Sequence, residues 1–237
     1  MVFRSSGGPL VLVAHGSREI SQQIGAVLCD AGFSPLRAPH GRDALRIIDR
    51  WNPVAAVLDV GLAEVMSFQV IEHIRSTEEL EGTKVVLVAS VYSRTAYKRR
   101  PTSLYGADDY VEQHHIPDLL ADKLCEHLGM AAPSAAGDES ERRRMIKDGE
   151  TRTDLSGSAR VRTLAHSIVA DIALYNEAEL HEVVRDGDIS CLEGALAEGR
   201  RILAERVNVN QDEELGDGDP VLDAFQRLVE DLRRGER

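Results

Sequence analysis

The sequence is poor in the residues that build disulfide frameworks, zinc sites and membrane helices. Its three cysteines, Cys29, Cys125 and Cys191, lie far apart, without a CxxC pair and without the His/Cys spacing of a zinc site. This usage is typical of a reducing cytoplasm. The N-terminus is too short and too polar for a secretory signal, and no apolar run approaches the roughly 18 residues of a membrane helix. We therefore expect a cytoplasmic protein that does not insert into a membrane.

Basic residues are also scarce, with 28 Lys and Arg against 40 Asp and Glu, and the formal net charge is −12. Nucleic acids and anionic membranes repel such a chain, so neither is expected as a general partner. The sequence has no P-loop and no GxGxxG motif, which argues against a nucleotide-binding enzyme. Soluble proteins are the partners that this composition favours.

The sequence does contain a regular alternation of short apolar runs and helical stripes over residues 9–129. Repeated βα units have this pattern, which predicts an α/β domain with a doubly wound, five-stranded parallel sheet and five helices. In the first helix Ile20, Ile24, Val27 and Leu28 share one face, and in the third Phe68, Ile71 and Ile74 do. Strands are expected at residues 10–14, 34–37, 54–58, 84–89 and 109–111.

Two further regions follow this domain. Residues 130–158 are rich in Ala, Pro, Ser, Gly and mixed charge, which predicts a flexible linker, with a short charged helix over 139–147 as the alternative. Residues 159–237 show four helical patterns and no strand pattern, which predicts a small all-α domain. Asn176 and Gly187 should end its first two helices, and Asp219 should cap the last. So small a core favours homodimerisation through these helices.

One carboxylate stands out, because Asp59 follows the apolar run of the third predicted strand. The carboxyl ends of parallel strands are where doubly wound sheets place their chemistry. Asp59 to Leu62, Ser90 at the end of the fourth strand, and the segment Gly106-Ala107-Asp108-Asp109-Tyr110 together resemble the receiver domain of bacterial two-component response regulators. The resemblance covers about residues 9–129 and implies the flavodoxin-like receiver fold.

The resemblance implies that Asp59 is the position of a phosphoacceptor, which accepts a phosphoryl group from a histidine kinase. In that family an acidic pair after the first strand helps the acceptor to bind Mg²⁺, and a lysine after the fifth strand adds a cation. Here His15 and Gly16 replace the acidic pair, and Gln113 replaces the lysine. Asp59 alone is a poor Mg²⁺ site. We therefore expect no cofactor, with Mg²⁺ relevant only if Asp59 is functional.

The resemblance also matches Ser90 and Tyr110 to the residues that switch on activation. One interpretation is a two-state switch biased by a partner, and the other is that serine and tyrosine merely suit a strand end. Other histidines invite a metal hypothesis. His15 lacks evident co-ligands, and the adjacent His114 and His115 are expected to point in different directions, so we predict no metal site at either place.

The segment between Ser90 and Gly106 should differ from the fourth helix of a receiver domain. Pro101 disfavours helical backbone at the residue before it, so the helix must be broken, displaced or begin only near Pro101. The segment is rich in Arg and Tyr, which are the residue types that dominate the binding energy of protein interfaces, so we predict a partner surface here. The alternative is that the basic residues simply cover a loop. The predicted surface comprises Tyr97, Lys98, Arg99, Arg100 and Tyr105, with Arg94 nearby.

Two functional hypotheses follow. The first is a non-enzymatic pseudo-receiver, an adaptor that acts without phosphorylation and binds other signalling proteins. The alternative is a conventional two-component response regulator that is phosphorylated on Asp59 and has a helical output or dimerisation domain. Labelling by acetyl phosphate that is lost in Asp59→Ala would favour the alternative.

Overall fold

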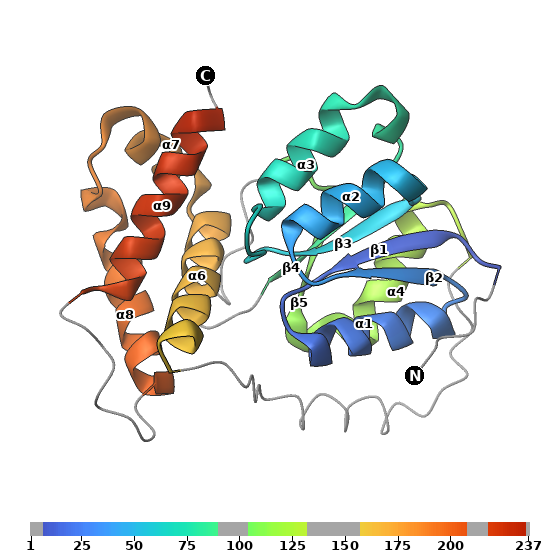
Figure 1. Cartoon of the computed structure of the whole chain (residues 1–237), viewed down its shortest axis with the longest axis horizontal. Helices are drawn as coiled ribbons and strands as arrows, with labels where there is room; N and C mark the ends of the chain where they lie inside the picture. The colour runs from blue at the N-terminus through green and yellow to red at the C-terminus, as the bar shows by residue number, and fades with distance from the viewer. Residues whose placement is uncertain (1–6, 90–103, 132–156, 208–217, 236–237) are drawn as a thin grey trace. The chain divides into compact units, whose positions relative to one another are not determined.

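The computed structural model describes residues 7–89, 104–131, 157–207 and 218–235 (Figure 1). These residues fall into two compact units, one before and one after the gap at 132–156, and each is described by itself. The predicted linker lies almost entirely in that gap and so outside the described residues.

The first unit is built on the predicted parallel sheet, with strand order β2-β1-β3-β4-β5. The strands are β1 Leu10–Ala14, β2 Ser34–Ala38, β3 Ala55–Asp59, β4 Lys84–Ala89 and β5 Asp109–Glu112. The prediction ended the third strand at Leu58, whereas Asp59 is the last residue of β3 and pairs with Val88 of β4. Its backbone is therefore fixed by the sheet.

Helices cover both faces of this sheet, as the doubly wound prediction requires. On one face lie α1 Arg18–Asp30 and α4 Ile116–His127, and on the other α2 Gly41–Trp51 and α3 Ser67–Ser76 (Figure 1). Two 3-10 turns, η1 Glu78–Leu80 and η3 Gln113–His115, complete the described part of this unit. The helix expected between β4 and β5 falls on residues 90–103, outside the described ranges.

Local signals start and orient these helices. Ser17 caps α1, because its Oγ accepts a hydrogen bond from the Ile20 amide at 3.4 Å. Ile20, Ile24 and Leu28 are buried as predicted. In α3 the predicted stripe is partly wrong: Val70 is fully buried, whereas Phe68 is half-buried, with its ring 6.1 Å from that of Tyr105.

The second unit contains, in the described residues, the four predicted helices. They are α6 Gly157–Tyr175, α7 Glu177–Asp186, α8 Glu193–Val207 and α9 Pro220–Gly235, with a 3-10 turn, η4 Ser190–Leu192, before α8. Gly187 ends α7 in the left-handed conformation with φ of 81°. Asp219 caps α9, since its Oδ1 accepts from the Val221 and Leu222 amides at 3.1 Å each.

Gly199 of α8 allows three helices of this unit to approach one another closely. A Cβ atom at this position would lie 3.0 Å from Ile168 Cγ2 and 3.2 Å from Ile172 Cδ1 in α6, and 3.4 Å from Val221 Cγ1 in α9. Ile168 and Val221 are buried, so the helices form a core of their own. No described helix of either unit combines the length and the apolar character that a membrane crossing requires.

Candidate functional site

Asp59 and His15 lie together at the carboxyl edge of the sheet. Ala14 pairs with Leu58 at the end of the β1–β3 ladder. The residues that follow this pair are His15, directly after β1, and Asp59, the last residue of β3. Both residues are buried, with exposed fractions of 5% for His15 and 7% for Asp59. The Gly61 amide donates a hydrogen bond to Asp59 Oδ1 at 3.1 Å. The carboxylate is therefore held by backbone on one oxygen and faces an imidazole on the other.

The imidazole of His15 is oriented by its own loop. The Ser17 amide donates to His15 Nδ1 at 3.0 Å, and the same Nδ1 lies 3.5 Å from Asp59 Oδ2. One nitrogen cannot accept from Ser17 and donate to Asp59 at once, so with the Ser17 bond made a neutral ring carries its proton on Nε2. This Nε2 is buried and has no hydrogen-bond partner among the described residues.

Gly16 and Gln113, the other two residues that differ from the receiver pattern, have surroundings unlike those of His15. Gly16 is exposed, and a Cβ atom added there would meet nothing within 4 Å, so the backbone leaves room for a side chain. Gln113 begins η3 directly after β5, which is two strands from β3 in the order β3-β4-β5. Of the three residues that differ from the receiver pattern, His15 is the one whose side chain contacts Asp59.

The predicted switch and partner residues are only partly described. Ser90, Arg94, Tyr97, Lys98, Arg99 and Arg100 lie outside the described residues. Tyr110 is half-buried in β5, with Lys123 Nζ 5.9 Å from the centroid of its ring. Tyr105 is half-buried, has a φ of 52° and packs on Phe68 of α3. The switch and the partner surface stay predictions.

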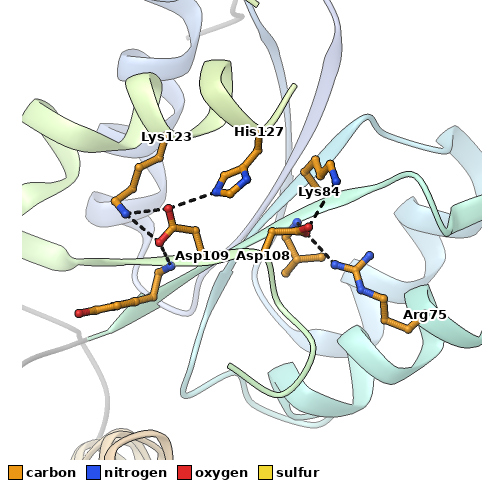
Figure 2. A network of polar contacts seen from close by, with 8 residues as sticks. Arg75, Lys84, Asp108, Asp109, Lys123 and His127 are labelled. Carbon is orange, nitrogen blue, oxygen red and sulfur yellow. Dashed lines mark hydrogen bonds and ion pairs between the residues drawn. The ribbon is translucent and has the colours of Figure 1, made fainter. Parts of the chain in front are cut away.

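Asp108 anchors the start of β5 to the neighbouring strand and helix (Figure 2). Its Oδ2 accepts from Arg75 Nη2 and from the Val85 amide, each at 2.7 Å, and its Oδ1 lies 3.4 Å from Lys84 Nζ. Arg75 also donates to the carbonyl oxygens of Gly106 and Thr83, each at 2.9 Å. The guanidinium thus ties α3 to the turn before β5 and to the loop before β4.

Asp109 makes the corresponding connection to α4, as Figure 2 shows. Lys123 Nζ lies 2.7 Å from both carboxylate oxygens, and His127 Nε2 lies 3.2 Å from Oδ2. Consecutive strand residues point to opposite faces, so the two aspartates reach helices on opposite faces of the sheet. The Gly106 to Tyr110 motif, which the sequence singled out as a family signature, therefore has a structural role in this chain.

Both carboxyl groups have a pKa below the ordinary value. Burial raises the pKa of Asp108, but the Val85 amide and the charges of Arg75 and Lys84 outweigh it. For Asp109, too, burial raises the pKa, and the hydrogen bonds from Lys123, the Tyr110 amide and His127 outweigh it. The unfolded chain then binds more protons than the folded one, so this stabilisation is present above the ordinary pKa of about 3.9 and is lost as the pH falls through the lower folded values.

Asp109→Asn is accordingly expected to lower the free energy of unfolding at pH 7 by about 1–2 kcal/mol, because a charged hydrogen-bond acceptor is lost at a partly exposed site. The remaining stability should depend less on pH below about pH 5 than in the wild type. Urea unfolding at several pH values between neutral and acid measures both effects. Glu72→Gln, at an exposed position of α3 outside this network, is the control, and an equal change in that variant would contradict the assignment.

His114 and His115 were expected to point apart, and this expectation is wrong. Their ring centroids lie 3.9 Å apart with an interplanar angle of 43°, and His114 Nε2 lies 3.3 Å from Glu112 Oε2. Both histidines belong to the 3-10 turn η3, which directly follows β5. Burial and the neighbouring His115 lower the pKa of His114, while Glu112 and Asp118 oppose the shift.

The chain is similar over about half of its length to a curated protein. No family model matches the chain. The Response regulator MprA of Mycolicibacterium vanbaalenii is 29% identical over 131 residues, which are 55% of this chain and 54% of that protein. The chain thus spans about half the length of the curated relative that it matches.

The solved structures to which the chain is similar include three response regulators or receiver domains. A putative response regulator from Chloroflexus aurantiacus J-10-fl has 20% identity and a TM-score of 0.45, covering 52% of this chain and 98% of its own. The chemotaxis response regulator CheY4 of Vibrio cholerae has 20% identity and a TM-score of 0.43, covering 51% and 98%. The receiver domain of the Francisella response regulator 1452 has 21% identity and a TM-score of 0.43, covering 52% and 98%.

The N-terminal unit has the flavodoxin-like strand order 2-1-3-4-5, with an aspartate at the end of β3. About half of the chain is thus similar to a protein named a response regulator, and a helical region follows the sheet unit.

Proposed function

We propose that this chain is a signalling protein whose receiver-like domain acts without regulated phosphoryl transfer to Asp59, as a pseudo-receiver that binds partner proteins. The contact between His15 and Asp59 carries the proposal. An imidazole 3.5 Å from Asp59 Oδ2 stands where the receiver resemblance requires a carboxylate, and its Nδ1 already accepts the Ser17 amide. This nitrogen is therefore poorly placed to serve as a metal ligand.

The distribution of metal-binding side chains supports the same proposal. Mg²⁺ prefers oxygen ligands in octahedral geometry and usually binds through one or two carboxylates with substrate oxygens. In the described parts of the chain, one group brings three ligand-bearing side chains within 4.8 Å of one another, and Asp59 is not part of it. Loss of a charge-stabilising group from a reacting site commonly costs about 10²–10³ in rate. Here His15 and Gly16 stand in place of the acidic pair, and Gln113 stands in place of the lysine.

A conventional response regulator remains the second candidate, because Asp59 has the position of an acceptor. It ends β3 at the carboxyl edge, and Gly61 donates its amide to the carboxylate. The relative that matches 55% of the chain is named a response regulator. The two candidates differ in one measurable property, which is the rate of phosphorylation of Asp59.

A variant that restores the acidic pair and the lysine separates the two candidates. His15→Asp, Gly16→Asp and Gln113→Lys are combined, and the open space beyond Gly16 favours the second substitution. The wild type is expected to accept phosphate from acetyl phosphate and Mg²⁺ at least about 100-fold more slowly than this variant. Intact-protein mass spectrometry over time gives both rates.

Asp59→Asn in each background shows whether the label sits on this residue. Rapid, Mg²⁺-dependent labelling of the wild type that Asp59→Asn abolishes would overturn the proposal in favour of the conventional regulator. A receiver domain known to accept phosphate from the same donor serves as the control for the reagent. Binding of partners through the predicted surface, homodimerisation and the absence of enzymatic activity stay predictions.

A further inference from the structure

Glu112, His114 and His115 bring three potential metal ligands together at the exit of β5. Glu112 is the last residue of β5, and the two histidines belong to η3. One ligand atom of each residue lies within 4.8 Å of the others, and His114 Nε2 lies 3.3 Å from Glu112 Oε2. All three side chains are half-buried, so the group is neither fully solvated nor closed to an ion.

We propose that Glu112, His114 and His115 bind a divalent transition-metal ion, with water completing its coordination. Bonds of about 2.0–2.1 Å in a tetrahedral arrangement put neighbouring ligand atoms about 3.3 Å apart. The pair formed by His114 and Glu112 already has this separation, and the remaining ligand atoms need to close by about 1.5 Å at most. Side-chain rotation supplies movements of this size.

The ligand types select the class of metal. Two imidazoles and one carboxylate suit Zn²⁺ and the metals near it in the first row, whereas Mg²⁺ and Ca²⁺ prefer oxygen ligands. Three protein ligands leave at least one position open to water. The net charge of −12 favours the approach of a cation to this protein.

The position of the group gives metal binding a structural consequence. Glu112 pairs with Ala89, so the site lies where β4 and β5 both end, at the edge of the sheet that carries Asp59. Gln113, which takes the place of the family's lysine, stands between the ligands in sequence. A bound ion would fix the turn that carries Gln113. The proposal does not depend on whether Asp59 is phosphorylated.

Isothermal titration of the full metal-free chain with Zn²⁺ tests the site. The wild type is expected to bind one equivalent, and His114→Ala, His115→Ala and Glu112→Gln should each weaken this binding by at least about tenfold. His181→Ala is the matched control, because His181 Nε2 and Glu177 Oε1 form a similar pair 3.6 Å apart on α7. Binding in that variant should equal binding in the wild type.

Co²⁺ absorption reports which atoms bind the metal. Because Cys191 is exposed, thiolate-to-cobalt charge transfer would mark binding there, whereas the proposed site predicts a spectrum without it. The conservative variants His114→Gln and His115→Gln, checked by circular dichroism, exclude loss of folding as the cause of lost binding. No binding by the wild type, undiminished binding in the histidine variants, or a thiolate spectrum would each overturn the proposal.

Discussion

Phe225→Ala is expected to destabilise the helical unit by about 3–5 kcal/mol while the sheet unit keeps its stability. Phe225 of α9 is 1% exposed and is one of the largest fully buried side chains. Removing a buried phenylalanine side chain costs about 3–5 kcal/mol. A helical domain of this size is stabilised by only about 4–12 kcal/mol, so the substitution removes much of the total. The sheet unit has its own core, formed by its strands with α1 and α4.

Hydrogen exchange of the full chain, followed by mass spectrometry, locates this effect. Peptides from α6, α8 and α9 should exchange much faster in Phe225→Ala, whereas peptides from β1 and β3 should exchange as in the wild type. Gln226→Ala changes the next residue, which is exposed, and surface substitutions of this kind alter stability by at most about 0.5 kcal/mol. Faster exchange in the strands would contradict the independence of the two cores.

Gly41→Ala is expected to destabilise the sheet unit by about 3 kcal/mol or more. Gly41 is the first residue of α2, and its amide donates to Ala63 O at 3.0 Å in the loop that follows β3. A Cβ atom at this position would lie 1.9 Å from Val65 O and 2.7 Å from Val65 C. These are backbone atoms, so the methyl group forces the loop between Asp59 and α3 to move.

A second glycine gives a control of opposite sign. Gly25 lies inside α1, and the nearest atom to an added Cβ is Pro35 Cγ at 3.9 Å, which is an ordinary contact. Gly25→Ala should therefore stabilise the unit by about 0.5–1 kcal/mol through helix propensity. Urea unfolding of the two variants beside the wild type measures both changes. Equal effects of the two substitutions would show that the loop yields to the methyl group.

The carboxyl edge of the sheet contains two arrangements with different chemistry. At the end of β3, a carboxylate faces an imidazole whose Nδ1 is already engaged by the Ser17 amide. At the end of β5, two imidazoles and a carboxylate converge, with His114 Nε2 3.3 Å from Glu112 Oε2. Nitrogen-rich ligand sets bind transition metals in preference to Mg²⁺. This contrast separates the proposed metal site from the position of the phosphoacceptor.

Strong local patterns allowed most of the fold to be predicted from the sequence. Buried parallel strands appear as short apolar runs, and Asn176, Gly187 and Asp219 mark helix ends through backbone geometry that depends on few neighbours. The face of α3 was less predictable. Val70 is buried in the core, whereas half-buried Phe68 lies beside Tyr105, a residue distant in sequence that helical periodicity cannot place.

The sequence by itself determined the βα alternation and the helical second unit, and it placed Asp59, His15, Gly16 and Gln113 at the positions that the receiver resemblance singles out. Only the tertiary structure decided what these side chains touch. Asp108 contacts Arg75 of α3, and Asp109 contacts Lys123 of α4. His15 Nδ1 lies near both the Ser17 amide and Asp59, and the rings of His114 and His115 lie close together. The reason is physical: hydrophobic periodicity and capping act over a few residues, whereas side-chain contacts depend on strand register and on segments far apart in the chain.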